Sequence, residues 1–412
     1  MKPRILSETG KLEGVILHRP GPEVENMTPV NAERALYSDI LNLSVASREY
    51  NQLSGILERF TQTFQVMDLL TDILNQEKVR LELINRVCRN ENVPETIPDL
   101  LELGAYELAR SFIEGVPLKK DTLTRFLSSQ EFALRPLHNF FYIRDACICL
   151  QDRVLIAKMA SRVRERESLI MEAIFQNHPD LSAETVNPLE CSNCEDGLSI
   201  EGGDVLTVRH DITLIGSGTR TSSQGIDFIL DRLRERKESH HVIVQELPNA
   251  PESFIHLDMA FTLLSDEYCM AYEPLIMKPN PHRTVYIRIE EGKVIEIRNV
   301  KNIVDTLAEL GMELEPVFCG GSHDQRLQER EQWHSGTNFF ALAPGKLIAY
   351  ERNIYTLEAV NRKGFEIIRA KDVLSGKKNP DEYSKWVISI EGSELARGGG
   401  GPRCMTMPLR RS

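Results

Sequence analysis

The segment Glu201–Ile215, EGGDVLTVRHDITLI, has the pattern from which the fold class is inferred. It begins with two acids around a Gly-Gly pair and continues as an apolar run, Val205–Val208. A turn at His210-Asp211 then leads to a second apolar run, Ile212–Ile215. Two short apolar runs joined by a turn that contains Asp are typical of a β-hairpin. We therefore predict a hairpin whose entry carries glycine and carboxylate groups.

The same outline of a polar residue, a strand, a turn and a second strand recurs along the chain. Further copies are Arg144–Ile156, His256–Asp266 and Thr337–Tyr350, and Leu12–Arg19 supplies a related strand. Helical stretches such as Ser222–Lys237 separate the copies. An internal repeat of this kind predicts an α/β fold in which radial or stacked units bury a shared core.

Candidate site residues stand at or just before the first strand of these repeats. They are Asp145, Glu201, Asp204, His256 and Asp258. In a strand, residues two apart share a face, so alternation predicts that His256 and Asp258 point the same way. If the units surround an axis, the strand starts converge on it.

Residues 71–135 have a different pattern of apolar residues. Val79, Leu83 and Val87 recur at helical spacing, and Pro98 suits the first turn of a further helix. Strand patterns are nearly absent from this segment. We predict an all-helical bundle, inserted at 71–135 into a single domain that spans 1–412, with a structural role as a cap or a lid.

The composition excludes several function classes. The 412 residues, with 41% hydrophobic content, can bury a sizeable core, and the net charge of −12 argues against a general nucleic-acid binder. No run of about 18 apolar residues is present, so no membrane span is expected. Met1–Gly10 lacks the apolar region of a secretory signal, so the expected location is the cytoplasm.

The eight cysteines are scattered, which is typical of reduced, buried thiols and not of a disulfide framework. Cys191 and Cys194 form one local pair, and Cys147 and Cys149 are spaced as strand neighbours. A zinc site would need a second pair or histidines at ligand spacing. We therefore expect no metal.

Residues 396–409, ARGGGGPRCMTMPL, are the strongest candidate for chemistry. Four consecutive glycines suit a backbone that must approach a ligand or move, and Cys404 closely follows them. A thiolate is a strong nucleophile, and positive charge from Arg403 or a protonated histidine would lower the pKa of the thiol. The alternative is a flexible tail with an incidental cysteine, and spacing alone leaves both open.

Three other segments fit the same chemistry. His256 beside Asp258 can transfer protons and bind a cation, although a lone His-x-Asp is more often part of a core. Glu201–Asp204 can bind a cation or form an acidic turn, and Asn139–Asp145 can be a site or the entry to a buried strand. Paired carboxylates hold a planar guanidinium best, and thiolate attack on its carbon splits a difficult hydrolysis into two steps.

Together these segments resemble the arginine deiminase family, within the guanidine-modifying superfamily of α/β propellers. The resemblance covers nearly the whole chain and is carried by SETGKL at 7–12, HRPG at 18–21, Arg144-Asp145, Glu201–Asp204, His256–Asp258 and RCMTMP at 403–408. It implies a pseudo-fivefold α/β propeller with an inserted all-helical bundle. It also implies an enzyme that hydrolyses free L-arginine to citrulline and ammonia without a cofactor.

The resemblance also implies roles for matching residues. Cys404 would be the nucleophile, His256 would protonate the departing ammonia and then activate water, and Glu201 would orient His256. Asp145 and Asp258 would clamp the guanidinium. The residues that would contact the rest of the substrate are Asn139, Tyr142, Arg164, Arg220 and Gly398.

Arg164 and Arg220 favour free L-arginine over agmatine, because two buried guanidinium groups need the substrate's carboxylate as a partner. By pattern alone, Arg164 can instead lie on a solvated helix face with interleaved charges. Tyr142-Ile143 stands where the family usually has Phe-Thr, and Ser38-Asp39 stands where it usually has two acids.

Other function classes stay open. An amidinotransferase, or a deiminase of another guanidino compound, would share the fold, and a non-catalytic arginine-binding protein would share the pocket. A binding module has no need of Cys404 as a nucleophile, which argues against that last class. The expected partner is L-arginine, with no nucleic acid and no membrane, and a homo-oligomer is compatible with the sequence.

Overall fold

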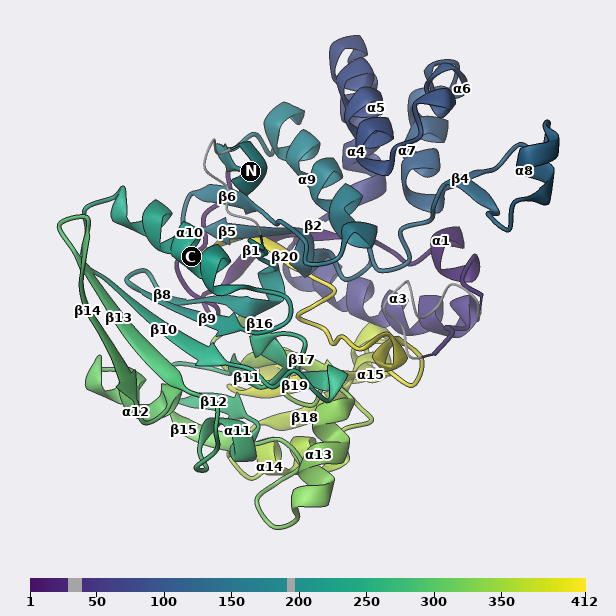
Figure 1. Ribbon diagram of the computed structural model, residues 1–412. Coiled ribbons are helices and arrows are strands. Elements are labelled where there is room, and N and C mark those ends of the chain that lie inside the picture. The colour runs from purple at the N-terminus through teal and green to yellow at the C-terminus, as the bar shows by residue number, and fades with distance from the viewer. Residues whose placement is uncertain (29–38, 191–196) are drawn as a thin grey trace.

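The computed structural model describes residues 1–28, 39–190 and 197–412 (Figure 1). The predictions for Ser38 and for the Cys191 and Cys194 pair lie outside these residues. The described chain has a mixed α/β fold. Helices surround the sheets, and a separate group of helices stands at the top of Figure 1.

Five sheets share one order of strands. In each, a first strand pairs antiparallel with a middle strand, and the middle strand pairs parallel with a third. In that order the strands are β20 (Met407–Arg411), β1 (Leu12–Leu17) and β2 (Gln62–Gln65); β5 (Cys147–Leu150), β6 (Arg153–Ile156) and β7 (Thr185–Val186); β8 (Val205–Arg209), β9 (Ile212–Ser217) and β10 (His240–Glu246); β11 (Phe261–Leu263), β12 (Tyr268–Ala271) and β15 (Glu315–Phe318); and β16 (Phe340–Ala343), β17 (Lys346–Tyr350) and β19 (Trp386–Ile390). The hairpins predicted in the four repeated segments are confirmed.

Additional strands widen two of the sheets. β13 (Thr284–Glu290) and β14 (Lys293–Val300) extend the sheet of β8–β10, and β18 (Glu366–Arg369) extends the sheet of β16, β17 and β19. The sheet of β20, β1 and β2 is built from both ends of the chain, with Ile16 opposite Met407. This pairing places the segment before β20, which carries Cys404, among the other strand starts.

Each of three hairpins is preceded by a single 3-10 turn. These turns are η2 (Ile143–Ala146), η5 (Gly202–Asp204) and η7 (Leu257–Met259). The prediction that His256 and Asp258 share a strand face is wrong, because the N–H of Met259 donates to the carbonyl of His256 at 3.1 Å and closes a turn. The candidate acids therefore lie on turns that enter the sheets, not on the strands.

Helix α10 (Ser223–Arg234) confirms the helix predicted within Ser222–Lys237. Its Ile226, Ile229 and Leu233 pack in one apolar cluster with Val242 of β10 and Ile287 of β13. The other helices around the sheets are α1 (Pro22–Glu25), α3 (Leu43–Phe60), α11 (Glu273–Ile276), α12 (Ile303–Glu309), α13 (Gln325–Trp333), α14 (Ile354–Asn361) and α15 (Ala370–Leu374).

The segment predicted to be helical contributes most of the group at the top of Figure 1. Its helices are α4 (Val66–Leu74), α5 (Glu77–Glu91), α6 (Ile97–Leu101), α7 (Ala105–Glu114) and α8 (Leu123–Leu127), and α9 (Glu165–Asn177) packs beside α4 and α5. The prediction of an all-helical segment is wrong in one detail, since β3 (Val116–Pro117) pairs with β4 (Phe132–Leu134). Helix α7 ends at Gly115, whose φ of 90° allows the chain to turn into β3.

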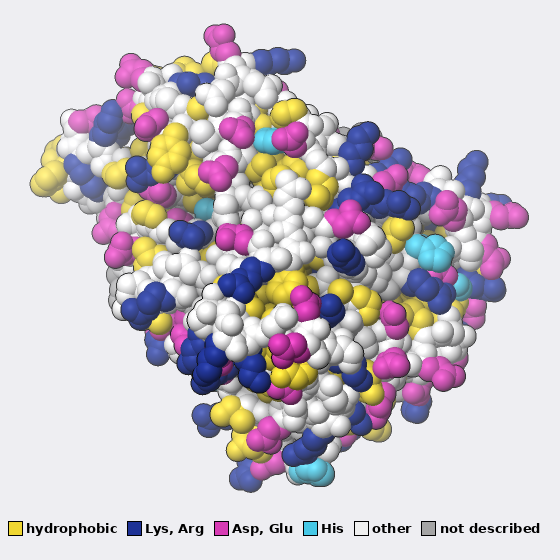
Figure 2. Space-filling view, turned by 180° about the vertical axis from the view of Figure 1, so that it is seen from behind, with side chains coloured by type: hydrophobic (Ala, Val, Ile, Leu, Met, Phe, Trp, Pro, Cys, Tyr) yellow, Lys and Arg dark blue, Asp and Glu magenta, His cyan; other side chains and the backbone are white. Residues whose placement is uncertain are grey.

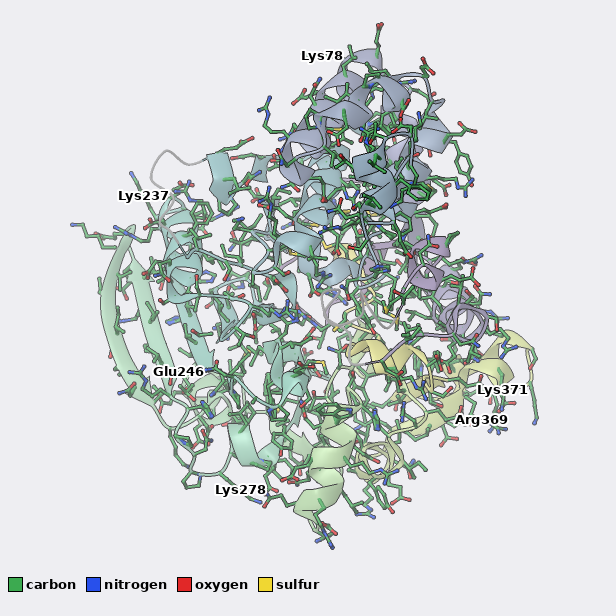
Figure 3. The ribbon with its side chains drawn as sticks, turned by 45° about the vertical axis from the view of Figure 1, so that its right-hand side comes forward. Lys78, Lys237, Glu246, Lys278, Arg369 and Lys371 are labelled. Atoms are coloured by element: carbon green, nitrogen blue, oxygen red, sulfur yellow. The ribbon has the colours of Figure 1, made fainter. Side chains whose placement is uncertain are left out.

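Charged side chains of both signs are interspersed on the face seen from behind (Figure 2). Lys78 lies at the tip of the helical group, and Lys237, Lys278 and Lys371 lie around the rim of the sheets (Figure 3). These labelled lysines are therefore far from the interior, where the candidate site residues lie. Among the described helices, none has the length and apolar character needed to cross a membrane.

Candidate active site

Cys404 lies in a tight turn just before β20 and is only 2% exposed. The glycine-rich loop ahead of it packs directly on the ring of Tyr142. A Cβ atom at Gly398 or Gly400 would come within 2.3 or 2.5 Å of Tyr142, so only glycine fits at either position. The loop is therefore part of the packed interior, and the alternative of a flexible tail is wrong.

His256 lies between two carboxylates. Its Nε2 is 3.0 Å from Oε2 of Glu201, and its Nδ1 is 3.6 Å from Oδ1 of Asp145. All three side chains are buried, because the turns η2, η5 and η7 meet at this point. Glu201 is itself held by the backbone N–H of Ala160, which donates to its Oε1 at 3.0 Å. An imidazole with two carboxylate neighbours is suited to carry a proton.

The electrostatics of this group favour a protonated His256. Burial alone lowers the pKa of His256, but the charge of Asp145 and the hydrogen bond to Glu201 more than offset burial and raise it to about 9. Burial raises the pKa of Glu201, yet the hydrogen bond and charge of His256 bring it down to about 2. Asp204, whose Oδ1 accepts the N–H of Leu257 at 2.9 Å, has its pKa raised by burial to about 7.

Asp258 links the Cys404 thiol to a buried arginine. Its Oδ2 is 3.7 Å from Sγ of Cys404 and 2.8 Å from Nη1 of Arg403. Arg403 also reaches Glu8 at 3.1 Å, so its guanidinium bridges two acids. Burial raises the pKa of the Cys404 thiol, and the charges of Asp258 and Asp145 raise it further. The thiol is therefore protonated in this arrangement and donates toward Asp258.

The two arginines proposed for the substrate's carboxylate differ in their surroundings. Arg164 is 5% exposed, so the alternative of a solvated helix face is wrong. Its Nη1 is 2.7 Å from Oδ2 of Asp145, and its Nη2 is 2.8 Å from Oε2 of Glu167. The side chain of Arg220 is 15% exposed, and its nearest acid is Glu201, at 3.8 Å. Arg220 is therefore the freer of the two to face a bound anion.

These groups lie around one small cavity, which has a volume of about 30 Å³. Of the residues with a predicted role in catalysis or substrate binding, all but Glu201 and Asp258 line it, namely Cys404, His256, Asp145, Asn139, Tyr142, Arg164, Arg220 and Gly398. The remaining candidate, Asp204, lies outside the lining. Glu201 and Asp258 stand one hydrogen bond behind the lining. A neighbouring cavity of about 460 Å³ shares Arg220, Ile255, Gly398 and Gly399 with it. A ligand in the larger cavity can therefore approach the thiol past these shared residues.

Tyr142 and Asn139 lie at the edge of the small cavity. The hydroxyl that distinguishes Tyr142 from the family's usual Phe donates to the carbonyl of Leu395 at 2.8 Å. This hydrogen bond therefore holds the backbone in place at the start of the glycine-rich loop. The carbonyl of Asn139 lies 3.5 Å from Nη2 of Arg164.

Within the described part of the chain, one group of side chains at the site could coordinate a metal. One ligand atom each from Asp145, Glu201 and His256 lie within 4.8 Å of one another. Coordination by His256 requires a neutral imidazole, whereas the raised pKa of His256 favours the protonated form. These residues therefore suit a proton and a cationic ligand better than a metal, and the expectation of no metal stays a prediction.

Sequence analysis missed several residues that support the site. Glu49 of α3 accepts N–H donation from Ser393, Glu394 and Leu395, three residues in succession, and so anchors the start of the loop that carries Cys404. Glu8 holds Arg403 from the far side. Glu8 lies in the SETGKL segment, which was one available signal, but nothing in the pattern around Glu49 pointed to a loop almost 350 residues away.

The ion pair of His256 and Glu201 predicts a pH dependence of stability. The folded pKa of His256, about 9, lies above the ordinary 6.5, so the pair stabilises the fold at low pH and loses that contribution as pH rises to 9. The window from pH 7 to 9 is the informative one, because Asp204 and Glu167, with pKa values raised to about 7, contribute mainly below it. The slope of the free energy of unfolding against pH should be negative across this window, because the folded protein keeps protons on His256 and on buried thiols such as that of Cys149, which the unfolded chain releases.

Denaturant unfolding at several pH values measures this slope. Glu201→Gln removes a carboxylate that raises the pKa of His256, so the slope between pH 7 and 9 should shrink in that variant. An equal slope in both proteins would contradict the assignment.

Solved structures of known enzymes share this fold. They include the N-terminal domain of ArgZ, an arginine dihydrolase from cyanobacteria, bound to substrate (TM-score 0.54, 12% identity, 97% of this chain and 98% of that chain). A dimethylarginine dimethylaminohydrolase adduct with S-methyl-L-thiocitrulline aligns with a TM-score of 0.50 (13%, 96% and 99%). SxtG, an amidinotransferase from Microseira wollei, aligns with a TM-score of 0.52 (13%, 99% and 97%). These likenesses show the fold alone, which is a mixed α/β fold shared with these enzymes.

Relatives in sequence identify the family to which the chain belongs among the proteins of this fold. A family profile described as arginine deiminase matches residues 33–411. An arginine deiminase of Listeria welshimeri is 32% identical over 99% of this chain and 98% of its own length. One of Mycoplasma capricolum is 30% identical over 100% of this chain and 97% of its own length. The chain belongs to the arginine deiminase family, and its enzyme class is that of hydrolases acting on amidines.

Proposed function

We propose that this protein hydrolyses free L-arginine to L-citrulline and ammonia through a covalent S-alkylthiouronium intermediate on Cys404. The observation that carries the proposal is the meeting of a buried thiol, an imidazole and three carboxylates at one cavity. These groups come from segments between residues 145 and 404 of the chain, so their convergence is a property of the fold. The family assignment supports the same reaction.

The charges explain why a guanidinium suits this site. Burial and the charges of Asp258 and Asp145 raise the pKa of the Cys404 thiol. A cation held between these two carboxylates would offset their effect and lower the pKa of the thiol. Substrate binding therefore favours the thiolate at the moment when an electrophilic carbon is beside it.

The chemistry proceeds in two halves. The thiolate of Cys404 adds to the guanidinium carbon, a carbon–nitrogen bond breaks, and protonated His256 gives a proton to the departing ammonia. Neutral His256 then takes a proton from water as the water oxygen adds to the same carbon. The carbon–sulfur bond breaks, which releases citrulline and restores the thiolate.

The substrate's carboxylate is assigned to Arg220. Its side chain lines both the small and the large cavity, whereas Arg164 is already engaged by Asp145 and Glu167. A charge-assisted contact between a guanidinium and a carboxylate is a strong one. Arg164 then acts mainly by holding Asp145, and the α-carboxylate selects arginine over its decarboxylated analogue.

Arg220→Ala should raise the KM for L-arginine roughly 10- to 100-fold, because it removes a charge-assisted contact to the carboxylate. Steady-state citrulline formation measures this change. The affinity for agmatine, which has no carboxylate, serves as the internal control and should change little. A parallel loss of affinity for both ligands would contradict the role of Arg220 in carboxylate recognition.

The proposed function is tested by incubating the purified protein with L-arginine and quantifying citrulline and ammonia. Equal amounts of both products are expected. An amidinotransferase would instead yield new guanidino compounds when amines are added. A non-catalytic binding protein would retain arginine without producing citrulline.

We further infer that the five sheets of like connectivity form a pseudo-fivefold α/β propeller. Their shared order of an antiparallel and then a parallel pairing supports this arrangement. The helical segment 71–135 is proposed as an insertion in one domain that spans 1–412. One apolar cluster supports this, because it joins Leu83 and Phe112 of that segment to Cys147 and Val154 of the second sheet.

The proposed location is the cytoplasm. The described cysteines are free thiols, as expected in a reducing compartment. Self-association into a homo-oligomer stays a prediction.

A further inference from the structure

The fourth repeat unit, Thr337–Tyr350, places an uncharged residue, Asn338, beside the candidate site. The first strand of each of the five sheets begins one to three residues after a site residue: β5 follows Asp145, β8 follows Asp204, β11 follows Asp258, β16 follows Asn338 and β20 follows Cys404. Of these five residues, Asn338 is the one with neither a charge nor a thiol. It is 1% exposed, so its amide needs partners inside the protein.

The Asn338 amide joins the nucleophile loop to the turn that carries Asp258. Its Oδ1 accepts the backbone N–H groups of Arg403, at 2.9 Å, and of Cys404, at 3.2 Å. Its Nδ2 donates to the backbone carbonyl of Asp258 at 3.3 Å. One side chain therefore fixes the backbone positions of the thiol and of the carboxylate 3.7 Å from it.

Two neighbours show that this contact is built into the fold. A Cβ atom at Gly401 would lie 2.6 Å from Oδ1 of Asn338, so glycine there permits the close approach. Thr337, which precedes Asn338, donates from its hydroxyl to the same carbonyl of Asp258 at 3.3 Å. Thr337 and Asn338 therefore both donate to one atom of the turn, the backbone carbonyl oxygen of Asp258.

A neutral amide suits this position better than an acid. It offers both an acceptor and a donor, whereas a carboxylate offers acceptors alone and adds negative charge. The charged groups that face the Cys404 thiol are Asp258, Asp145 and Arg403, and the phenols of Tyr142 and Tyr350 lie near it. Another carboxylate beside it would raise the pKa of the thiol further.

We propose that Asn338 is a positioning residue that holds Cys404 and Asp258, which belong to two other repeat units, in one geometry. The inference deepens the proposed function and rests on it for the identity of the reaction. Asn338 does not touch the reacting atoms, so it acts through the two residues that it joins. A displacement of reacting groups by about 1 Å can cost on the order of 10²-fold in rate.

The test compares Asn338→Ala with Asn353→Ala in the full-length protein. Asn353 is a matched control because it is 3% exposed and its Nδ2 donates to the carbonyl of His334, outside the lining of the small cavity. Both variants should lose thermal stability. Asn338→Ala alone should lower kcat for citrulline formation roughly 10- to 100-fold, with a smaller change in KM.

A second measurement does not depend on turnover. The rate at which iodoacetamide alkylates Cys404 should change in Asn338→Ala and stay close to wild type in Asn353→Ala. Asn338→Asp keeps the acceptor oxygen, so it should recover part of the lost stability. Its alkylation profile should move to higher pH, because the added carboxylate disfavours the thiolate.

The outcomes separate the two proposals. If the wild-type protein makes no citrulline, the proposed function fails, while the alkylation rates still report on Asn338. If Asn338→Ala matches Asn353→Ala in both kcat and alkylation, the positioning role is overturned. The role is also overturned if the loss of kcat follows from a loss of folded protein, as measured by unfolding at the assay temperature.

Discussion

Cys404→Ala should abolish citrulline formation, by at least about 10⁴-fold, while the variant still binds L-arginine. The reason is that the proposed reaction passes through a carbon–sulfur bond and that, among the residues the structure describes, no other thiol lines the cavity. Cys404 is 2% exposed, and alanine fills most of its space, so the fold should tolerate the change. Citrulline assay and isothermal calorimetry with arginine measure the two expectations.

A matched cysteine variant controls for general effects of removing a thiol. Cys319 is also buried, and its neighbours are Thr356 and Gly336, outside the lining of the cavity. Cys319→Ala should therefore keep turnover within a few-fold of wild type. Rapid quenching of wild-type protein with arginine should trap an adduct on Cys404 with the mass of arginine less ammonia. Turnover by Cys404→Ala would refute the assignment of the nucleophile.

His256→Gln should lower kcat with L-arginine by about 10²- to 10⁴-fold, the range typical of a lost general acid–base group. In the proposed mechanism His256 carries the proton, and Asp145 and Glu201 lie on either side of its imidazole. Glutamine keeps a polar side chain of similar length but cannot transfer a proton. Binding of arginine should persist, since the two clamping carboxylates are unchanged.

A substrate with a better leaving group separates the two halves of the reaction. S-methyl-L-thiocitrulline loses a methylthio group, which needs less help from an acid than ammonia does. His256→Gln should therefore form the covalent adduct from this compound but hydrolyse it slowly, and mass spectrometry should show the adduct accumulating. His240→Gln is the matched control, because His240 is buried and contacts Thr213, away from the cavity. Fast hydrolysis of the adduct in His256→Gln would show that another group activates water.

Local sequence patterns were sufficient to predict many of the hairpins and helices of the fold. The hairpins β5–β6 and β8–β9 and the helix α10 appear where alternation and helical spacing predicted them. These elements depend on neighbouring residues, so a short window of sequence contains the necessary signal. The same reasoning failed at His256-Leu257-Asp258, because the local pattern continues into β11 while the backbone closes the turn η7 first.

The candidate site was predicted mainly from residue chemistry and from the family resemblance. Cys404, His256 and Asp145 meet at one cavity, in line with that prediction. The partners of the buried arginines were not predicted. A charged side chain in a sequence indicates that a partner is needed when it is buried, but it does not indicate which partner.

The sequence alone therefore determined which groups are available for chemistry and which segments become hairpins or helices. The tertiary structure alone decided that Arg403 bridges Asp258 and Glu8, that Glu49 anchors the loop that carries Cys404 and that Asn338 joins this loop to Asp258. The physical reason is separation along the chain: Arg403 and Glu8 are 395 residues apart. Such contacts form only when whole sheets pack, and packing depends on the sum of many weak interactions that no local pattern contains.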